Sequence, residues 1–175
     1  MHYNIPMINY TSLETRSSLI LLLFVMLLLY KLKSLWFFLM HRTLLQRHRT
    51  LKKLKALSWD DFERLSMELF EKRGWKVLGN SKKGADGGVD IWMQKGSLLG
   101  RKTKAIVQCK RYDNAMVTIK VIREMYGLMH EYGSDEVYVV TTSRFTKECH
   151  AFVKEKKFTL IDGESLVKAI NKIKS

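Results

Sequence analysis

Apolar and polar residues follow two different patterns along the chain. Leu19 to Tyr30 reads LILLLFVMLLLY, an unbroken apolar run that predicts a helix without a polar face. Further on, apolar residues such as Leu65 and Leu69 recur at helical spacing among charged residues, which predicts an amphipathic helix. Ser58 is a suitable N-cap for that helix, and Gly74 is expected to end it.

The remaining sequence alternates between short apolar runs and helical spacing. Apolar or β-branched runs bounded by turn residues predict strands at about residues 75–78, 89–94, 104–110, 137–142 and 158–161. Helical spacing predicts further helices at about residues 117–133, 146–156 and 164–172. The predicted fold class is α/β, a mixed β-sheet flanked by helices in the order α-β-β-β-α-β-α-β-α and preceded by the hydrophobic helix.

The charge of the chain suggests a polyanionic partner. Its 175 residues include 31 Lys+Arg and 17 Asp+Glu, a formal net charge of +14, and both nucleic acid and an anionic membrane surface attract such a chain. The stretch from Arg42 to Lys55 contains several basic residues and no acid. Cys109 and Cys149 lack metal-type spacing, so we expect reduced thiols and no structural zinc site.

These patterns divide the chain into an N-terminal tail (1–16), a transmembrane or membrane-anchoring helix (17–40), a basic juxtamembrane segment (41–57) and a folded domain (58–175). The apolar run alone would reach about 18 Å, short of the ~30 Å hydrocarbon core. The predicted span therefore extends to Leu35–Met40 (LWFFLM) and includes Lys31 and Lys33. A core helix would show a polar face, and a signal peptide would end in a small-residue cleavage site. The apolar run has neither feature.

The basic residues after the apolar run set the expected orientation. By the positive-inside rule, residues 41–57 would stay on the cytoplasmic side. The predicted location is therefore the cell inner membrane, as a single-pass protein with its C-terminal domain in the cytoplasm. The same segment could grip anionic lipid or DNA phosphate, or form a solvated helix, and the sequence leaves these alternatives open.

Three polar residues on two predicted strands carry the candidate chemistry. Asp90 follows a glycine-rich turn at residues 84–88 and begins a strand. Gln108 and Lys110 lie two apart on the next strand and therefore share one face, while Cys109 points to the other. If the two strands pair as a hairpin, Asp90 comes close to Gln108 and Lys110.

Phosphodiester hydrolysis explains why these residue types would occur together. A divalent cation polarises the phosphate and lowers the pKa of the attacking water, and Mg²⁺ prefers oxygen ligands. Lys110 could orient that water or stabilise developing charge, and Glu63 or Glu68 on the first helix could complete the metal ligands. Taken singly, each feature also has a structural interpretation: an Asp after Gly-Gly is usually a turn residue, and Gln-x-Lys on a strand usually faces solvent.

Several sequence blocks occur together in a recognisable order. They are Phe62-Glu63, Gly74-Trp75-Lys76-Val77, Gly84-Ala85-Asp86-Gly87-Gly88-Val89-Asp90-Ile91, Val107-Gln108-Cys109-Lys110-Arg111, Thr141-Thr142-Ser143 and Leu160-Ile161-Asp162-Gly163. With these blocks, residues 58–170 resemble the Mrr-type restriction endonuclease domain of the PD-(D/E)xK nuclease superfamily. The DGGVD block together with QCKR carries most of the resemblance.

The resemblance implies a restriction-endonuclease-like fold and a Mg²⁺-dependent endonuclease, with Mn²⁺ as a substitute, acting on double-stranded DNA. By matching position, Asp90 would bind the metal, Gln108 would be the second ligand and Lys110 the catalytic lysine. Glu63 matches the acid on the first helix and would be the third metal ligand. Gln108 replaces the acid of the superfamily pattern, as in the Mrr-like branch, and this should weaken metal binding.

The chain also departs from the family in lacking a separate DNA-recognition domain, so specificity for a modified base is not expected to follow. Basic residues could supply phosphate contacts that position DNA without reading its sequence; the main candidates are Lys82, Lys83, Arg111 and Arg123. The favoured function is a membrane-anchored DNA endonuclease, acting against foreign or modified DNA and forming a homodimer. The alternatives are a catalytically inactive membrane-tethered DNA-binding protein and a membrane-surface interaction protein.

Overall fold

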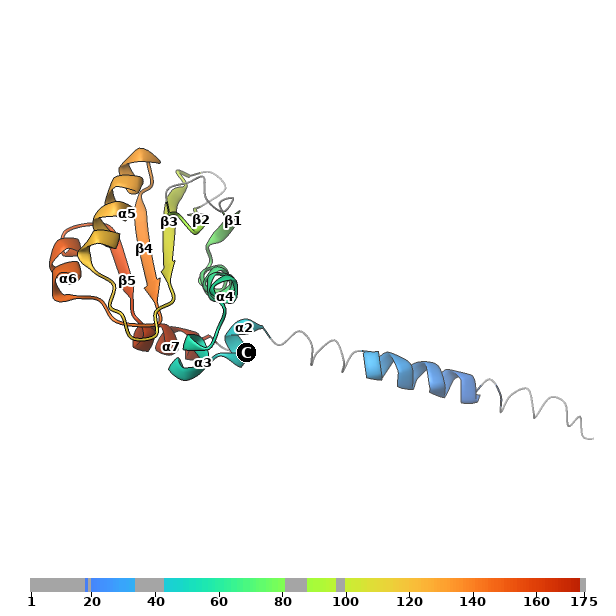
Figure 1. The fold of residues 1–175 in the computed structure, drawn as a ribbon. Coiled ribbons are helices and arrows are strands. Elements are labelled where there is room, and N and C mark those ends of the chain that lie inside the picture. Colours follow the sequence, from blue (N-terminus) through green and yellow to red (C-terminus); the bar gives the residue numbers. More distant parts are fainter. Residues whose placement is uncertain (1–17, 19, 34–42, 81–87, 97–99, 174–175) are drawn as a thin grey trace, which may run out of the picture. The chain divides into compact units, whose positions relative to one another are not determined.

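The structure, a computed structural model, describes residues 18, 20–33, 43–80, 88–96 and 100–173 (Figure 1). The chain divides into two compact units, Met1–Arg42 and Thr43–Ser175. The second unit contains the β-sheet and all of the candidate catalytic residues that the structure describes.

In the first unit, residues 20–33 form a helix whose apolar side chains are exposed. At 1.5 Å per residue this stretch is about 21 Å long, which is less than the ~30 Å hydrocarbon core. No helix among the described residues is long and apolar enough to cross a membrane. The prediction of a single-pass inner-membrane protein is therefore wrong. Residues 17, 19 and 34–40 of the predicted span lie outside the described residues.

The helix predicted from Ser58 is present as α4 (Trp59–Lys72). Ser58 Oγ accepts a hydrogen bond from the Asp61 N–H at 3.1 Å, and acidic residues in the first turn favour the positive end of the helix dipole. Apolar residues on one side of the helix, including Phe62 and Leu65, are fully buried. Gly74 follows the helix with a φ of +81°, a conformation that glycine adopts without strain.

Five strands form one mixed sheet in the order β1-β2-β3-β4-β5, which confirms the predicted sheet type. The strands are β1 (Lys76–Asn80), β2 (Ile91–Lys95), β3 (Thr103–Lys110), β4 (Glu136–Thr141) and β5 (Phe158–Ile161). The first three pair antiparallel, and β3, β4 and β5 pair in parallel. β3 therefore lies at the centre, with an antiparallel neighbour on one side and a parallel neighbour on the other.

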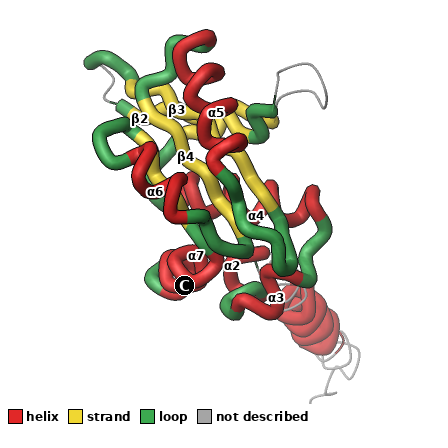
Figure 2. The backbone as a smooth tube through the Cα atoms, turned by 60° about the vertical axis from the view of Figure 1, so that its left-hand side comes forward, coloured by secondary structure: helices red, strands yellow, loops and turns green. Residues whose placement is uncertain are grey.

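Helices cover both faces of the sheet (Figures 1 and 2). The helices α5 (Ile119–Glu131) and α6 (Lys147–Val153) pack on one face, against β3 and β4 residues such as Ile106. The helices α4 and α7 (Gly163–Asn171) pack on the other face, where the β3 residues are Ala105, Val107 and Cys109. Alternate β3 residues thus contribute to two separate hydrophobic cores.

Two short helices that were not predicted precede α4. They are α2 (Leu44–Arg47) and α3 (Leu51–Lys55), and each buries one leucine, Leu45 or Leu54, in the core beside α4 and α7. At Gly163, an added Cβ atom would lie 2.6 Å from both Leu51 Cδ1 and the Thr142 carbonyl oxygen, so only glycine allows this close approach. The described part of the basic segment 41–57 therefore packs into the domain.

Candidate active site

The start of β2 and the end of β3 bring a carboxylate and an amide together. The strands pair antiparallel with Ile91 opposite Val107, and the Asp90 N–H donates to the Val107 carbonyl at 2.9 Å. Gln108 Nε2 donates to Asp90 Oδ2, and the Cys109 N–H donates to the same oxygen at 2.5 Å. The hairpin thus holds the Asp90 and Gln108 side chains in direct contact.

Burial and charge shift the proton affinity of Asp90. Burial raises its pKa from the ordinary value of 3.8 to about 6, and the nearby negative charge of Glu63 acts in the same direction. The Cys109 N–H, the positive charge of Lys110 and the Gln108 amide all oppose this rise. The charges of Glu63 and Lys110 thus act on Asp90 in opposite directions.

Trp59 connects Glu63 with Lys110. Its indole Nε1–H donates to Glu63 Oε1 one helical turn further along α4, and Glu63 is only 6% exposed. The Lys110 ammonium lies 5.7 Å from the centre of the Trp59 ring, within the range of a cation–π contact. In the sequence, Trp59 was recognised only as part of the helix start. The i, i+4 spacing of Trp59 and Glu63 was the signal that could have pointed to the contact.

Gly88 leaves room for the Gln108 side chain. Its φ is +108°, and a Cβ atom added there would lie 3.2 Å from Gln108 Oε1 and 4.0 Å from Glu124 Oε1. The Gln108 amide therefore directs its oxygen toward Gly88 and its nitrogen toward Asp90. For the oxygen to share a cation with Asp90, this amide would have to rotate.

Glu68, the weaker candidate on α4, lies elsewhere. Its Oε2 accepts from the Leu45 N–H at 3.4 Å, which connects α4 to α2. Five residues separate Glu68 from Glu63, and at 3.6 residues per turn this places the two side chains about 140° apart around the helix. Of the two acids, the structure brings only Glu63 to the charges of Asp90 and Lys110.

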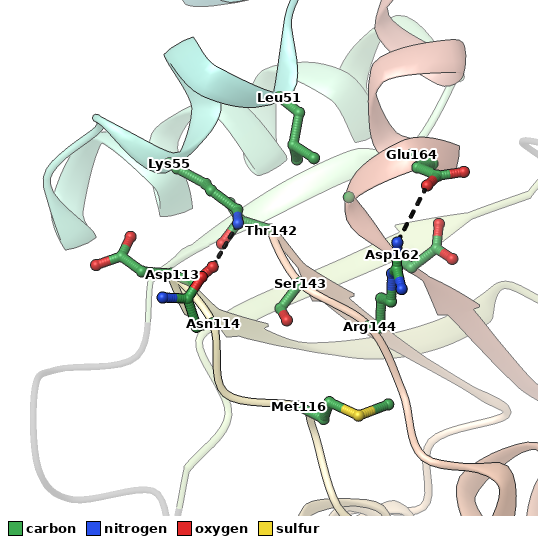
Figure 3. Close-up of a pocket in the computed structure, with 11 residues that line it drawn as sticks. Leu51, Lys55, Asp113, Asn114, Met116, Thr142, Ser143, Arg144, Asp162 and Glu164 are labelled. Atoms are coloured by element: carbon green, nitrogen blue, oxygen red, sulfur yellow. Dashed lines mark hydrogen bonds and ion pairs between the residues drawn. The ribbon is translucent and has the colours of Figure 1, made fainter.

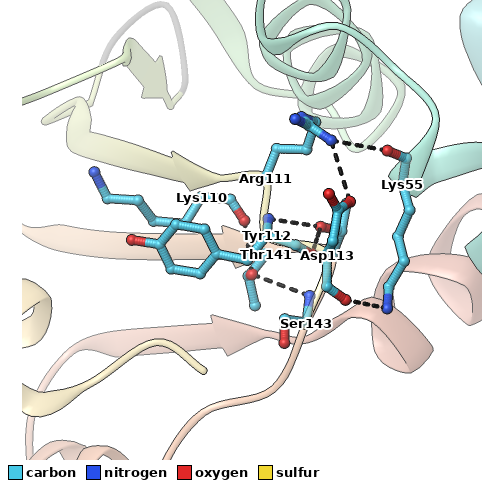
Figure 4. Close-up of polar contacts among 8 residues, drawn as sticks. Lys55, Lys110, Arg111, Tyr112, Asp113, Thr141 and Ser143 are labelled. Atoms are coloured by element: carbon cyan, nitrogen blue, oxygen red, sulfur yellow. Dashed lines mark hydrogen bonds and ion pairs between the residues drawn. The ribbon is translucent and has the colours of Figure 1, made fainter. Parts of the chain in front are cut away.

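The predicted DNA-contacting residues have different environments. Lys82 and Lys83 lie outside the described residues, as does Asp86. Arg123 is exposed on α5. Arg111 Nη1 donates to the Lys55 carbonyl at 2.9 Å and lies 3.3 Å from Asp113 Oδ1 (Figure 4), so it joins the end of β3 to α3.

Polar contacts also fix the chain where β3 ends (Figure 4). Thr141 Oγ1 donates to the Lys110 carbonyl at 2.7 Å. Further along both segments, the Tyr112 N–H donates to Thr142 Oγ1 at 3.0 Å, and that hydroxyl donates to the Tyr112 carbonyl at 2.7 Å. The backbone at Lys110 is therefore held from β4, which limits where its side chain begins.

A surface pocket of about 310 Å³ lies close by but is separate (Figure 3). Lys55 donates to the Asp113 carbonyl in this pocket, and Arg144 faces Glu164 at 3.8 Å. None of Asp90, Gln108, Lys110 or Glu63 lines it. The lining residues include both charge signs and are Leu51, Lys55, Asp113, Asn114, Met116, Thr142, Ser143, Arg144, Asp162, Gly163 and Glu164.

The oxygen atoms at the Asp90 site suit a hard divalent cation. Asp90 and Glu63 supply carboxylates, and Gln108 can supply an amide oxygen, the donor types that Mg²⁺ prefers. Among the residues that the structure describes, no three His, Cys, Asp or Glu side chains are grouped to hold a metal. The Gln108 amide oxygen would be a third protein donor beside the two carboxylates. The carboxylate repulsion that raises the Asp90 pKa is what a bound dication would relieve.

Comparison with known families agrees with this geometry. The family model described as "Restriction endonuclease" (Mrr_cat) matches residues 54–170, which include both strands of the site and the whole of α4. The chain belongs to this restriction endonuclease family. The match begins within α3, so the sequence likeness also reaches beyond the predicted boundary at Ser58. No curated protein sequence matches the chain significantly.

A solved structure of a larger restriction endonuclease has a similar fold. The DNA modification-dependent restriction endonuclease AspBHI matches with a TM-score of 0.53 and 15% sequence identity, over 73% of this chain and 34% of that one. The MspJI restriction endonuclease in complex with a 27-mer oligonucleotide matches with a TM-score of 0.45 and 22% sequence identity, over 80% of this chain and 30% of that one. The chain thus spans about a third of the length of these restriction endonucleases.

Proposed function

We propose that the chain is a Mg²⁺-dependent endonuclease that hydrolyses phosphodiester bonds of double-stranded DNA. The observation that carries the proposal is the contact of Asp90 with Gln108 where β2 begins and β3 ends, beside Lys110 and Glu63, which both contact Trp59. Membership of the restriction endonuclease family supports it. Mn²⁺, which accepts the same oxygen ligands, is expected to substitute for Mg²⁺.

Each side chain has a proposed role. Asp90, Glu63 and the Gln108 amide oxygen would hold the cation, which when bound polarises the phosphate and lowers the pKa of the attacking water. Lys110 carries a positive charge close to Asp90 and would orient that water or stabilise charge on the phosphate oxygens. The Cys109 N–H fixes the Asp90 carboxylate through its backbone hydrogen bond. The fixed carboxylate is then already placed when the cation arrives.

DNA is the proposed polyanionic partner. The net charge of +14 supports attraction to phosphate, and Arg123 is one exposed residue available for it. The structural neighbour AspBHI is described as a DNA modification-dependent restriction endonuclease, which supports DNA as the substrate class. For this chain we propose no preference for a modified base. A single site cuts one strand, so cleavage of both strands would require a second copy, as in a homodimer, or two successive events.

The decisive experiment compares the purified full chain with Lys110→Met on supercoiled plasmid in Mg²⁺. We expect Lys110→Met to lower the cleavage rate by at least about 100-fold, the scale for loss of one charge-stabilising group. Lys104→Met is the matched control: it removes the same charge from the other end of β3, where the side chain is exposed, and should cut normally.

Two results would contradict the proposal. One is a folded wild-type chain that leaves every plasmid intact with both metals, and the other is a Lys110→Met chain that cuts as fast as the wild type. Binding of DNA without cleavage would then support the alternative of a catalytically inactive DNA-binding protein. A role in defence against foreign DNA is proposed from the family alone, and phage plating on cells that express the wild-type or the Lys110→Met chain tests it.

A further inference from the structure

We propose that Trp59 is a positioning residue of the active site, which holds Glu63 through its N–H and Lys110 through its ring. This inference rests on the proposed function. It adds a residue from the first turn of α4 to the site. Trp59 acts through these two side chains and need not touch DNA or metal itself.

Trp59 contacts two residues of the proposed active site. Its side chain is 38% exposed, and it belongs to neither hydrophobic core cluster among the described residues. Its indole N–H donates to Glu63 Oε1, and its ring lies 5.7 Å from Lys110 Nζ. The Trp59 ring is partly covered, and both its N–H and its π face contact residues of the proposed active site.

The local sequence fixes this arrangement. Ser58 caps α4 and makes Trp59 the first helical residue. Trp59 and Glu63 are four residues apart, which brings their side chains together on the helix surface. Lys110 approaches from the end of β3, whose backbone is held by Thr141. One aromatic side chain thus connects α4 with the catalytic strand.

The two contacts have different chemical consequences. A carboxylate accepts several hydrogen bonds, so the indole N–H can fix the Glu63 carboxylate and still leave oxygen lone pairs that a cation can use. The ring attracts the Lys110 ammonium through its π face and leaves that group charged. We therefore expect the N–H to support metal binding and the ring to support the chemical step.

Two substitutions separate these consequences. Trp59→Phe keeps an aromatic ring and removes the N–H, while Trp59→Leu removes both. Binding of Mn²⁺ to the full chain without DNA is measured by electron paramagnetic resonance. Both variants should bind Mn²⁺ more weakly, by roughly three- to tenfold, the scale of one ordinary hydrogen bond, because the N–H acts on the cation only through Glu63. At saturating Mg²⁺, Trp59→Phe should cut plasmid at nearly the wild-type kcat, whereas Trp59→Leu should be slower by about tenfold.

Trp75→Phe provides the matched control. The Trp75 ring also carries a lysine ammonium, Lys95 Nζ at 5.8 Å, but packs in the core against Tyr138. This variant should bind Mn²⁺ and cut plasmid like the wild type. Thermal unfolding midpoints of all variants show whether a change reflects loss of folding.

The outcomes distinguish this inference from the proposed function. If the wild type cuts plasmid and binds Mn²⁺, but both Trp59 variants match it in metal affinity and kcat, the positioning role is wrong and the nuclease stands. Equal losses of kcat at saturating Mg²⁺ in Trp59→Phe and Trp59→Leu would also overturn the assignment of separate roles to N–H and ring. A folded wild-type chain that binds no Mn²⁺ would overturn the metal site and this inference together.

Discussion

At the scale of single residues, the folded environment of Asp90 disfavours its charged form. Its pKa is raised to about 6 because burial and the charge of Glu63 disfavour the carboxylate. In the unfolded chain the same group would titrate near its ordinary pKa of 3.8. The folded state therefore binds the Asp90 proton more tightly than the unfolded state does. The protonated carboxyl contributes its full stabilisation below pH 3.8, and this contribution is lost as the pH rises through about 6.

We predict that Asp90→Asn stabilises the metal-free protein at pH 8. Each pKa unit corresponds to about 1.4 kcal/mol, so the wild type should lose up to about 3 kcal/mol of unfolding free energy from this group between pH 4 and 8. The Asp90→Asn side chain carries no charge, so the variant should lack that loss while cutting no DNA. Urea unfolding in EDTA at pH 4 and pH 8 measures the difference.

The exposed Glu155→Gln serves as the control for this prediction, because removing its charge should leave the difference between the two pH values unchanged. If the Asp90→Asn protein is less stable than the wild type at pH 8, neighbouring groups stabilise the Asp90 carboxylate in the metal-free fold and the prediction is wrong. Added Mg²⁺ should stabilise only the wild type, by mass action.

The site shows which residues a sequence can indicate. Asp90, Gln108 and Lys110 stand in two recognisable blocks, and strand pairing explains why distant blocks share a site. Glu63 and Glu68 are the same residue type on the same helix, so residue type could not distinguish them as site residues. In the structure, the charge of Glu63 acts on Asp90, whereas Glu68 contacts Leu45 of α2. Trp59 was missed because its two contacts depend on where β3 ends relative to α4.

At the scale of helices and strands, the short helices α2 and α3 contribute to the domain core. Leu54 is fully buried beside α4 and α7. We predict that Leu54→Ala lowers the unfolding free energy by about 2–5 kcal/mol, the usual range for a buried leucine. The neighbouring Lys53 is exposed, and Lys53→Ala should change stability by less than about 0.5 kcal/mol. Urea unfolding of both full-length variants compares them directly.

A Leu54→Ala protein as stable as Lys53→Ala would show that α3 is dispensable for the domain. The same logic applies to the domain boundary: if α2 and α3 are part of the core, a chain that starts at residue 58 should unfold more readily than one that starts at residue 43. The compact unit begins at Thr43, in agreement with this expectation.

The accuracy of the predicted elements follows from the length of their patterns. The helix from Ser58 was predictable because its cap, apolar spacing and final glycine agree. The mixed sheet was predictable because short apolar runs alternate with helical spacing. α2 and α3 were not, since each spans little more than one turn and buries one leucine among basic residues. A hydrophobic repeat cannot be recognised over so few residues.

At the scale of the whole molecule, positive charge and catalytic carboxylates have opposite effects on DNA binding. The net charge of +14 attracts phosphate at long range. Asp90 and Glu63 repel the same phosphate at the site until a cation offsets them. In the proposed function, attraction therefore depends on salt and not on metal, whereas cleavage would require the metal.

We predict that the full chain binds duplex DNA in EDTA and that salt weakens this binding steeply. With about four phosphate contacts, raising the salt from roughly 50 to 200 mM should lower the affinity by about 100-fold. Asp90→Asn should bind a few-fold more tightly than the wild type in EDTA, because one repelling charge is gone, although it cannot cut. Fluorescence anisotropy with a labelled duplex measures both effects, and Glu131→Gln, an exposed acid at the end of α5, controls for net charge. Equal affinities for Asp90→Asn and Glu131→Gln would mean that phosphate does not approach Asp90, and the hairpin would then not be the site where DNA is cut.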